Sequence, residues 1–407
     1  MPDVVIIGAG QAGAETATAL RQQGFAGSIT LLGDESHPPY RRPPLSKTFL
    51  SGEAALESLY LRPEAAYARA NVDLRCAARV DGIDRAARRV LLSDGASLPY
   101  NKLVLATGGS ARRLAIPGDA GKHNLHVLRS VADVQRIREY LAPGKRLTVI
   151  GGGYIGLEAA AVAVSLGVRV TVLEAAPRLL VRVAAPELSE YYHAFHTGRG
   201  VDIRVGAGVE RFEGTAGRIE TVCCADGTRI DTDVVIAGVG LAPNVQLAVT
   251  AGLAVDNGIM VDEFAQTSDP DIYAAGDCAE LPSAFLGRRV RLESVQNAIE
   301  QGRAVAAGLC GNAKSYDPVP WFWSDQYHLK LQMVGMPQDY DRVVTRGSRA
   351  EHSFAIFYLR DGGIIGAETV NRPQEFMLAR QLVAKRARLD PARLADDALP
   401  LKSLLTA

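Results

Sequence analysis

Two short glycine-rich segments have the spacing that lets a main chain approach phosphate. One reads GAGQAG and the other GGGYIG, so both follow the pattern GxGxxG. The first glycine permits a tight turn, the second lets the backbone come close to a pyrophosphate, and the third lets a helix pack closely on a strand. The phosphate then lies at the helix N-terminus, where N–H groups and the helix dipole favour an anion. The glycines concerned are Gly8, Gly10, Gly13, Gly151, Gly153 and Gly156.

An acidic residue follows each glycine loop at a distance that suits a ribose. Asp34 and Glu35 lie 26 and 27 residues after the first glycine of the first loop, and Glu174 lies 23 residues after that of the second. A carboxylate at this place accepts hydrogen bonds from ribose hydroxyls. Glu174 would repel a 2′-phosphate, and the nearest following cation is Arg178, so we expect the second loop to prefer NADH over NADPH.

Each loop lies between a predicted strand and a predicted helix. Apolar, β-branched runs at residues 3–7 and 146–150 precede the two loops, and a helical pattern and a further strand follow each of them. Glycine turns in an ordinary α/β sheet are the alternative interpretation, but they would have to produce the same order of strand, loop, helix and acid twice. We therefore predict an α/β fold with two Rossmann-like dinucleotide-binding domains.

The character of the sequence changes near residue 320. Segments such as HSFAIFYLRDGGIIGAETV alternate around a DGG turn, which predicts antiparallel strands. With helices predicted at 373–388 and 391–405, this part forms a C-terminal α+β domain. The predicted domains are residues 1–110 with 242–320, residues 111–241, and residues 321–407.

The composition excludes several classes of function. The 407 residues include 45 basic and 45 acidic side chains, and a chain without a basic excess is not expected to bind nucleic acid. The sequence shows neither a signal-peptide pattern nor an apolar stretch long enough for a membrane span, so we expect no membrane partner. Five scattered cysteines without a CxxC pair fit a reducing cytoplasm and predict no metal site.

Two dinucleotides in one chain suggest that a hydride passes between them. We expect a resident flavin at the first loop and a visiting nicotinamide at the second. The segment YRRPPLSK, which ends at Lys47, would then lie near the flavin ring, with Glu158 in the second helix as the opposite charge. An ordinary surface position is the alternative for Lys47.

The chain resembles the FAD-dependent NADH–ferredoxin reductases, which have the glutathione-reductase-like fold. The resemblance runs from residue 3 to about residue 405 and rests on these motifs in this order: GAGQAG, RRPPLSK, LVLATGG, GGGYIGLE, TSDPDIYAAGDCA, VRLESVQNAIEQ and WFWSDQY. It implies an enzyme that moves a hydride from NADH to FAD and then single electrons to a [2Fe–2S] ferredoxin. That ferredoxin would serve a cytochrome P450 or a ring-hydroxylating oxygenase. The alternatives are a reductase of a quinone or monodehydroascorbate and an NADH-sensing flavoprotein that switches partners.

The resemblance also implies roles for individual residues. Lys47 and Glu158 would be the catalytic side chains. FAD would be bound by Gly8, Gly10, Ala12, Gly13, Asp34, Glu35, Arg42, Pro44, Lys47, Val80, Ala106, Thr107, Gly108, Arg129, Gly276, Asp277, Val295 and Trp323. NADH would be bound by Gly151, Gly153, Ile155, Gly156, Glu174 and Gly240. Plain core packing is the alternative for Trp323, and we prefer it for the neighbouring Trp321.

The electron acceptor should lie outside the chain. The CxxxxC and CxxC redox motifs of related flavoproteins are absent, and we interpret Cys223 and Cys224 as structural. Ferredoxins are acidic, so docking should use basic residues. The candidates are Arg62, Arg303, Arg380, Lys385, Arg386 and Arg388. The last four could equally form a solvated helix face.

Overall fold

The computed structural model describes residues 3–215 and 217–404. The chain divides into two compact units, each assembled from separate stretches of sequence. Unit 1 comprises Met1–Arg41, Leu59–Ser110 and Ala242–Phe322, and unit 2 comprises Arg42–Ser58, Ala111–Leu241 and Trp323–Ala407.

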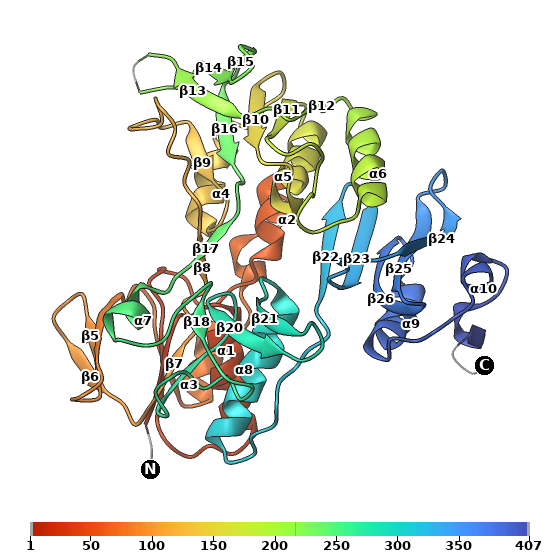
Figure 1. The fold of residues 1–407 in the computed structure, drawn as a ribbon. Coiled ribbons are helices and arrows are strands. Elements are labelled where there is room, and N and C mark those ends of the chain that lie inside the picture. The colour runs from red at the N-terminus through yellow and green to blue at the C-terminus, as the bar shows by residue number, and fades with distance from the viewer. Residues whose placement is uncertain (1–2, 216, 405–407) are drawn as a thin grey trace. The chain divides into compact units, whose positions relative to one another are not determined.

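A five-stranded parallel sheet forms the centre of unit 1 (Figure 1). Its strand order is β19-β7-β1-β2-β3, and all neighbouring strands pair in parallel. The strands are β1 (Val4–Ile7), β2 (Ile29–Leu32), β3 (Val72–Arg75), β7 (Lys102–Leu105) and β19 (Ile272–Ala274). The central strand β1 reads VVII and is buried along its whole length, as expected for a parallel strand covered on both faces.

Two helices cover one face of this sheet. Helix α1 (Gln11–Gln22) and helix α8 (Val295–Leu309) pack against each other, and both contribute to the apolar cluster that includes Val4 and Ile6. A Cβ on Gly302 of α8 would lie 2.8 Å from the carbonyl oxygen of Ala12. The glycine therefore allows the two helices to approach each other closely.

The other face of the sheet, lined by Val5 and Ile7, is covered by two small three-stranded sheets and a short helix. They are β4 (Val80–Asp84), β5 (Arg89–Leu92), β6 (Ser97–Pro99), β18 (Ile259–Met260), β20 (Ala279–Ser283), β21 (Arg288–Arg291) and α7 (Gln246–Thr250). Helix α3 (Glu64–Arg69) also belongs to unit 1, and its Tyr67 joins the apolar cluster that contains Val4 and Ile6. The short helix η2 (Leu56–Leu59) ends where the chain re-enters unit 1. The chain leaves unit 1 in β8 (Gly109–Ala111) and returns in β17 (Leu241–Pro243).

Unit 2 contains a second parallel sheet with the same kind of strand order. The order is β12-β11-β10-β16-β9, with β9 (Leu125–Val127), β10 (Arg146–Ile150), β11 (Arg169–Glu174), β12 (Asp202–Val205) and β16 (Val234–Ala237). All four pairings are parallel. In both sheets the strand before the glycine loop is central, and the strand that follows the loop's helix pairs with it. Both sheets are therefore built from the predicted βαβ unit.

The other elements of this middle part include helices and a small antiparallel sheet. The helices are α4 (Val131–Arg138), α5 (Tyr154–Ser165) and α6 (Pro186–Thr197), and the sheet contains β13 (Val209–Glu213), β14 (Thr221–Cys224) and β15 (Arg229–Asp231). Helix α4 begins with a capping box, because Ser130 and Asp133 satisfy each other's backbone N–H groups. The short elements η1 (Pro43–Ser46) and α2 (Thr48–Ser51) pack on α4 and α5.

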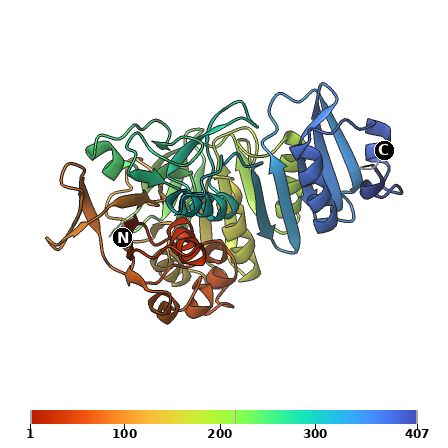
Figure 2. The same ribbon diagram turned by 90° about the horizontal axis from the view of Figure 1, so that it is seen from below.

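An antiparallel sheet makes up the C-terminal part of the chain. Its order is β22-β23-β26-β25-β24, and α9 (Pro373–Ala384) packs on β26 and β23 (Figure 2). The strands are β22 (Trp321–Gln326), β23 (Leu329–Gly335), β24 (Arg342–Ser348), β25 (Ser353–Arg360) and β26 (Gly363–Val370). Asp361 and Gly362 both have positive φ, of 50° and 76°, so the DGG segment makes the predicted hairpin turn.

The two predicted C-terminal helices were too long. Helix α9 ends at Ala384, and Arg386 has a φ of 46°, which stops a helix. The predicted helix at 391–405 is replaced by α10 (Pro391–Ala395) and η3 (Leu401–Leu404). The helix is interrupted at Asp396, whose side chain accepts from the N–H of Ala398, and residue 405 lies outside the described residues. Side-chain bonding to the local backbone competes here with helix continuation.

The observed elements confirm the predicted fold class. Two parallel sheets, each with a glycine loop and a helix after the central strand, are followed by a C-terminal antiparallel sheet with helices. The predicted division into residues 1–110 with 242–320, residues 111–241 and residues 321–407 stays a prediction.

A buried acid lies in the C-terminal sheet. Glu368 on β26 is 2% exposed, and its Oε2 accepts a hydrogen bond from the hydroxyl of Tyr358 on β25 at 2.5 Å. Burial raises the pKa of Glu368 to about 8. The folded protein therefore holds a proton on Glu368 at pH values at which the unfolded chain releases it.

This proton makes the stability of the fold depend on pH. Because the pKa is raised on folding, the contribution is present below the unfolded pKa and is lost as pH rises through about 8. The glutamine in Glu368→Gln cannot ionise. We therefore expect the thermal midpoint of this variant, relative to that of the wild type, to be higher at about pH 8 than at about pH 5 by about 2–6 °C. Circular dichroism melts at both pH values measure this, and an equal difference at both would show that the pKa of Glu368 is ordinary.

Candidate functional site

The first glycine loop joins β1 to α1 and is closed against the sheet. Gly8 has a φ of +113°, and a Cβ there would overlap the carbonyl oxygen of Ala106. A Cβ on Gly13 would overlap the carbonyl oxygen of Gly8. A Cβ on Gly10 would have no atom of the described residues within 4 Å, apart from its chain neighbours and the backbone of its own helix. The loop is thus open at its middle glycine, and the capping position of α1 there has no side chain bonded to it. This geometry fits a pyrophosphate.

Three strand ends meet beside this loop because β19, β7 and β1 are neighbours in the sheet. The loop after β7 contains Ala106, Thr107 and Gly108, and the loop after β19 contains Gly276 and Asp277. A Cβ on Gly276 would lie 2.9 Å from the Cβ of Ala12, so the third loop touches the first. Ligands of parallel sheets bind at the carboxyl ends of the strands. The structure therefore brings these predicted FAD residues together.

A residue that the sequence analysis missed orders one of these loops. The side-chain amide of Asn244 donates to the carbonyl oxygen of Thr107 at 2.9 Å, and the hydroxyl of Thr107 donates to the carbonyl oxygen of Asn244 at 2.7 Å. Asn244 ends the segment GVGLAPN, and an asparagine after a glycine-rich turn was the one available signal.

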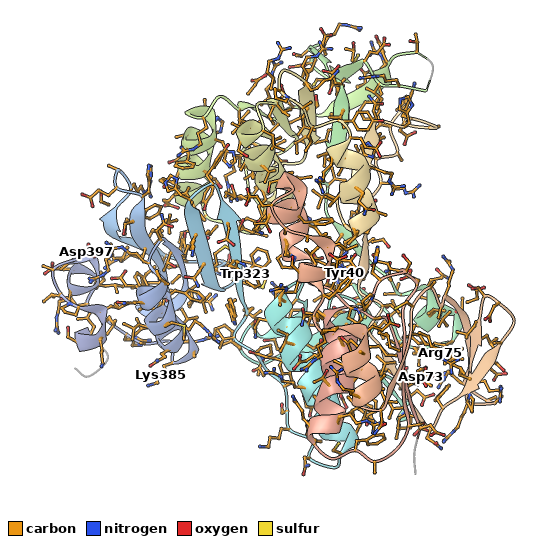
Figure 3. All side chains as sticks on the ribbon, turned by 180° about the vertical axis from the view of Figure 1, so that it is seen from behind. Tyr40, Asp73, Arg75, Trp323, Lys385 and Asp397 are labelled. Carbon is orange, nitrogen blue, oxygen red and sulfur yellow. The ribbon has the colours of Figure 1, made fainter. Side chains whose placement is uncertain are left out.

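The two acidic residues after β2 have different surroundings. Asp34 is exposed, whereas Glu35 is half-buried. Oε2 of Glu35 accepts a hydrogen bond at 2.6 Å from the hydroxyl of Tyr40, which is labelled in Figure 3. The carbonyl oxygen of Glu35 accepts from the N–H of Ala77, which ties the start of β4, with Val80, to the same place. Val295 is the first residue of α8 and is half-buried.

The second glycine loop, between β10 and α5, repeats the geometry of the first. Gly151 has a φ of +108°, and a Cβ there would overlap the carbonyl oxygen of Gly238. A Cβ on Gly156 would overlap the carbonyl oxygen of Gly151. A Cβ on Gly153 would have no described atom within 4 Å, apart from its chain neighbours and the backbone of its own helix. The second loop therefore also offers a helix N-terminus to a pyrophosphate.

Glu174 at the end of β11 is bound into this loop. Its Oε2 accepts from the N–H of Gly152 and its Oε1 accepts from the N–H of Ala176, both at 2.7 Å. The guanidinium of Arg178 donates to the carbonyl oxygens of Ala184 and Val181 and to the hydroxyl of Ser189. The nearest following cation is therefore already bonded within the fold.

Two more predicted NADH residues surround the second loop. Gly240 follows β16, the neighbour of β10, and has a φ of +108°. The guanidinium of Arg182 would lie 3.4 Å from a Cβ on Gly240. Ile155, in the first turn of α5, is 46% exposed, which is high for an isoleucine. An exposed apolar side chain at a loop of this kind suits a ligand with a flat, partly apolar face.

The structure places Lys47 beside Glu158. The distance between Nζ of Lys47 and Oε2 of Glu158 is 2.8 Å, and Glu158 is only 4% exposed. Lys47 directly follows η1, whose two prolines, Pro43 and Pro44, restrict the backbone before it. Glu158 lies on α5, two residues after Gly156, the last glycine of the loop. A buried carboxylate is costly unless it is paired, and this ion pair offsets that cost.

Two serines that the sequence analysis missed complete the surroundings of this carboxylate. Ser46 donates to Oε2 of Glu158 at 2.5 Å, and Ser324 donates to Oε1 at 2.6 Å. Ser46 precedes Lys47, but no spacing in the sequence relates positions 46, 158 and 324. Only the fold brings these three segments together.

Four of the predicted FAD residues belong to unit 2 together with Lys47. A guanidinium nitrogen of Arg42 donates to the carbonyl oxygen of Arg129 at 2.7 Å, just before α4 begins. Pro44 lies in η1, and Trp323 is half-buried on β22 (Figure 3). The FAD residues in the glycine-loop region belong to unit 1.

The predicted docking cations have different surroundings. Arg62 is exposed, whereas Arg303 forms a 2.6 Å ion pair with Glu15. Of the C-terminal group only Arg380 lies on α9, where it is half-buried, while exposed Lys385 (Figure 3), Arg386 and Arg388 follow the helix. These four residues therefore do not form one solvated helix face.

The described residues contain no group of three or more His, Cys, Asp and Glu side chains that could hold a metal ion. Five cysteines are unbonded, and Cys223 and Cys224 are buried in β14. Among the described helices none is both long and apolar enough to cross a membrane.

Comparisons with known proteins cover the whole chain. The sequence profile of the pyridine nucleotide-disulphide oxidoreductases matches residues 2–302, and a profile of reductase C-terminal domains matches residues 321–405. Putidaredoxin reductase of Pseudomonas putida is 48% identical over 409 residues, which cover 100% of this chain and 97% of that protein. Rhodocoxin reductase of Rhodococcus erythropolis is 44% identical over 399 residues, 98% of this chain and 93% of that protein.

Solved structures agree with these sequence matches. The crystal structure of the covalent putidaredoxin reductase–putidaredoxin complex matches with a TM-score of 0.96 at 47% identity, over 100% of this chain and 98% of that chain. The ferredoxin reductase for the CYP199A2 system of Rhodopseudomonas palustris matches with a TM-score of 0.96 at 42% identity, over 99% of both chains. This chain therefore belongs to the pyridine nucleotide-disulphide oxidoreductase family, among the FAD-dependent NADH–ferredoxin reductases.

Proposed function

We propose that the protein is an NADH-dependent reductase of a [2Fe–2S] ferredoxin that serves a cytochrome P450 or a ring-hydroxylating oxygenase. The observation that supports this most directly is the pair of glycine loops, each closed against its sheet and open at the middle glycine. Relatives similar along the whole chain are named as reductases of putidaredoxin and rhodocoxin, and others as the reductase components of an O-demethylase and a dioxygenase system.

The residues of unit 1 fit the pyrophosphate and ribose of FAD. Gly10 would face the pyrophosphate at the N-terminus of α1, and Asp34 or Glu35 would accept from the ribose. Asp277 would bind the ribityl chain. FAD, when bound, supplies the conversion of one hydride into two single electrons. The chain's own part is to position the cofactors and to supply charges.

The surroundings of Glu174 support a preference for NADH over NADPH. Its carboxylate is held by two backbone N–H groups, so it cannot swing away from a 2′-phosphate. Arg178 makes three hydrogen bonds to other groups and is not free to pair with that phosphate. The repulsion would therefore stay uncompensated.

Lys47 and Glu158 are proposed as the side chains nearest the reaction. Glu158 is buried and Lys47 is half-buried, and the lysine ammonium is held by a carboxylate that two serine hydroxyls fix in place. A cation fixed in this way would stabilise negative charge that develops nearby. Neither side chain needs to act as a nucleophile.

The electrons would leave for an acceptor outside the chain, because the unbonded cysteines include no CxxC or CxxxxC pair, and we propose a ferredoxin as that acceptor. We place this system in the cytoplasm, where unbonded cysteines are the rule. The exposed cations that follow α9, among them Lys385 and Arg388, are proposed to meet the acidic ferredoxin.

An anaerobic titration with each nicotinamide tests this function first. We expect the flavin absorbance of the purified protein to bleach at NADH concentrations at least about tenfold lower than those of NADPH, because Glu174 opposes the 2′-phosphate. In Glu174→Ala the difference between the two nucleotides should shrink. A colourless protein, or no bleaching by either nucleotide, would exclude the proposed function. Bleaching by NADH without reoxidation by any ferredoxin would favour a small-molecule reductase or a redox sensor.

Substitution of the middle glycines distinguishes the two loops. Gly10 and Gly153 have ordinary φ values of −93° and −84° and open space at the Cβ position, so valine should leave the fold intact. We expect Gly10→Val to purify without flavin because its side chain fills the pyrophosphate's place. Gly153→Val should keep its flavin but bind NADH about tenfold or more weakly.

Flavin content and NADH titrations measure these two effects, with circular dichroism as the control for folding. A full flavin content in Gly10→Val would contradict the loop assignment.

The proposed docking surface predicts a dependence on salt. With putidaredoxin as the acceptor, kcat/KM should fall as ionic strength rises, whereas the rate with the small acceptor ferricyanide should stay nearly constant. Lys385→Glu should lower kcat/KM for putidaredoxin about three- to tenfold, and Lys330→Glu, which changes an exposed lysine on β23, should not. Equal salt dependence with both acceptors would refute docking through these cations.

A further inference from the structure

A chain of buried hydrogen bonds leads away from Glu158 on the side opposite to Lys47. Ser324 donates to Oε1 of Glu158 at 2.6 Å, and the amide nitrogen of Gln326 donates to the hydroxyl oxygen of Ser324 at 3.1 Å. The carbonyl oxygen of Gln326 lies 2.7 Å from Nε2 of His196, and Nδ1 of His196 lies 3.4 Å from the hydroxyl of Tyr327. All these residues belong to unit 2.

Three elements contribute to this chain, and they lie side by side in Figure 1. Glu158 is on α5, His196 is on α6, and Ser324 and Gln326 are on β22. Ser324 and Gln326 are two residues apart on one strand, so their side chains lie on the same face. The exposed fractions of Ser324, Gln326 and His196 are 0%, 1% and 0%.

The direction of every hydrogen bond follows from the charge on Glu158. A carboxylate can only accept, so Ser324 uses its proton for Glu158 and must accept from Gln326. The amide nitrogen of Gln326 is thereby the donor, and its carbonyl oxygen is left to accept from His196. His196 must therefore carry its proton on Nε2, which leaves Nδ1 to accept from Tyr327.

The state of His196 agrees with this direction. Burial lowers the pKa of His196 to about 4, so the ring is neutral near pH 7 and carries a single proton. A neutral ring can donate from Nε2 and accept at Nδ1, as the chain requires. A protonated ring could not accept from Tyr327.

Apolar residues would fill this place at lower cost. Burying three polar side chains removes their bonds to water, and hydrogen bonds between them only offset that loss. A fully satisfied buried network, however, fixes each member in one orientation. The network ends on the carboxylate that holds Lys47. A fixed orientation of its members would therefore also fix this carboxylate.

We propose that His196, Gln326 and Ser324 are positioning residues that hold the Glu158 carboxylate, and through it the Lys47 ammonium, in the geometry needed for hydride transfer from NADH. This inference rests on the proposed function. It adds three residues from α6 and β22 to the predicted catalytic groups, of which Lys47 directly follows η1 and Glu158 lies on α5. Small misplacements of a catalytic group can cost up to about 10²-fold in rate.

Variants at His196 test the proposal with a matched control on the same helix. His196→Ala removes the donor to Gln326, whereas His196→Gln keeps an amide N–H at a similar distance from the backbone. His193 lies on α6 as well, is partly exposed and takes no part in the chain, so His193→Ala is the control. The rate constant for flavin reduction by NADH is measured by anaerobic stopped flow, together with the apparent Kd for NADH.

We expect a split between rate and affinity. His196→Ala should reduce flavin about three- to tenfold more slowly with the Kd for NADH changed less than about twofold, because the loop at Gly153 and Glu174 is untouched. His196→Gln should recover most of the rate, and His193→Ala should match the wild type. A slower rate in His193→Ala as well, or no loss in His196→Ala, would overturn the proposal. Ser324→Ala, which breaks the chain at its other end, repeats the test if His196→Ala does not fold.

A double-mutant cycle separates positioning from general damage to the fold. If His196 acts through Glu158, then His196→Ala should not slow flavin reduction further in a Glu158→Gln background. Full additivity of the two effects would overturn the proposal. The same cycle is measured with thermal midpoints. The midpoint of the double variant should fall by less than the sum of the decreases in the two single variants.

The thermal cycle also distinguishes a failure of the proposed function from a failure of the proposed positioning role. If NADH does not reduce the wild type, the proposed function fails, and the coupling between His196 and Glu158 is judged from the midpoints alone. Additive losses of the thermal midpoint would exclude the positioning chain as well. Losses smaller than additive would show that the chain stabilises the ion pair of Glu158 and Lys47.

Discussion

Both nucleotide loops depend on one steric constraint, the contact between the first glycine of the loop and a carbonyl group at the end of the neighbouring strand. A Cβ on Gly8 or Gly151 would overlap the carbonyl oxygen of Ala106 or Gly238. Since the loop is pressed against the sheet, the following helix starts at a fixed place with its free N–H groups beside the open middle glycine. The position of each proposed phosphate site thus follows from backbone packing rather than from any charged side chain.

The buried charge on Glu158 organises the surroundings of Lys47 within unit 2 in the same indirect way. Lys47, Ser46 and Ser324 reach this carboxylate from two other segments of the chain. Because the carboxylate only accepts, its charge also sets the direction of the bonds that continue to Gln326 and His196. One ionised group therefore fixes the hydroxyl, amide and imidazole groups beyond it, at the cost of keeping all of them away from water.

The acids that follow the two loops differ in how they are held. Glu174 is bonded by two backbone N–H groups, one of which belongs to Gly152 in the second loop. Glu35 is bonded by the side chain of Tyr40 and lies beside exposed Asp34. A rigid carboxylate discriminates against a phosphate because it cannot move away. This rigidity is suited to a site where a nicotinamide dinucleotide enters and leaves and must be told from its phosphorylated form.

The sequence by itself determined the two βαβ units, the C-terminal antiparallel sheet and the family, because each has a local signal: glycines at fixed spacing, the strand and helix periods, and a DGG turn. It also indicated Lys47 and Glu158 as opposite charges. It overestimated the C-terminal helices, since the stop at Arg386 depends on a backbone angle and not on a helix-breaking residue. Only the tertiary structure decided which groups surround Glu158 and that Arg178 is already bonded. Those contacts join residues more than 100 positions apart or depend on side-chain direction, and local patterns do not record either.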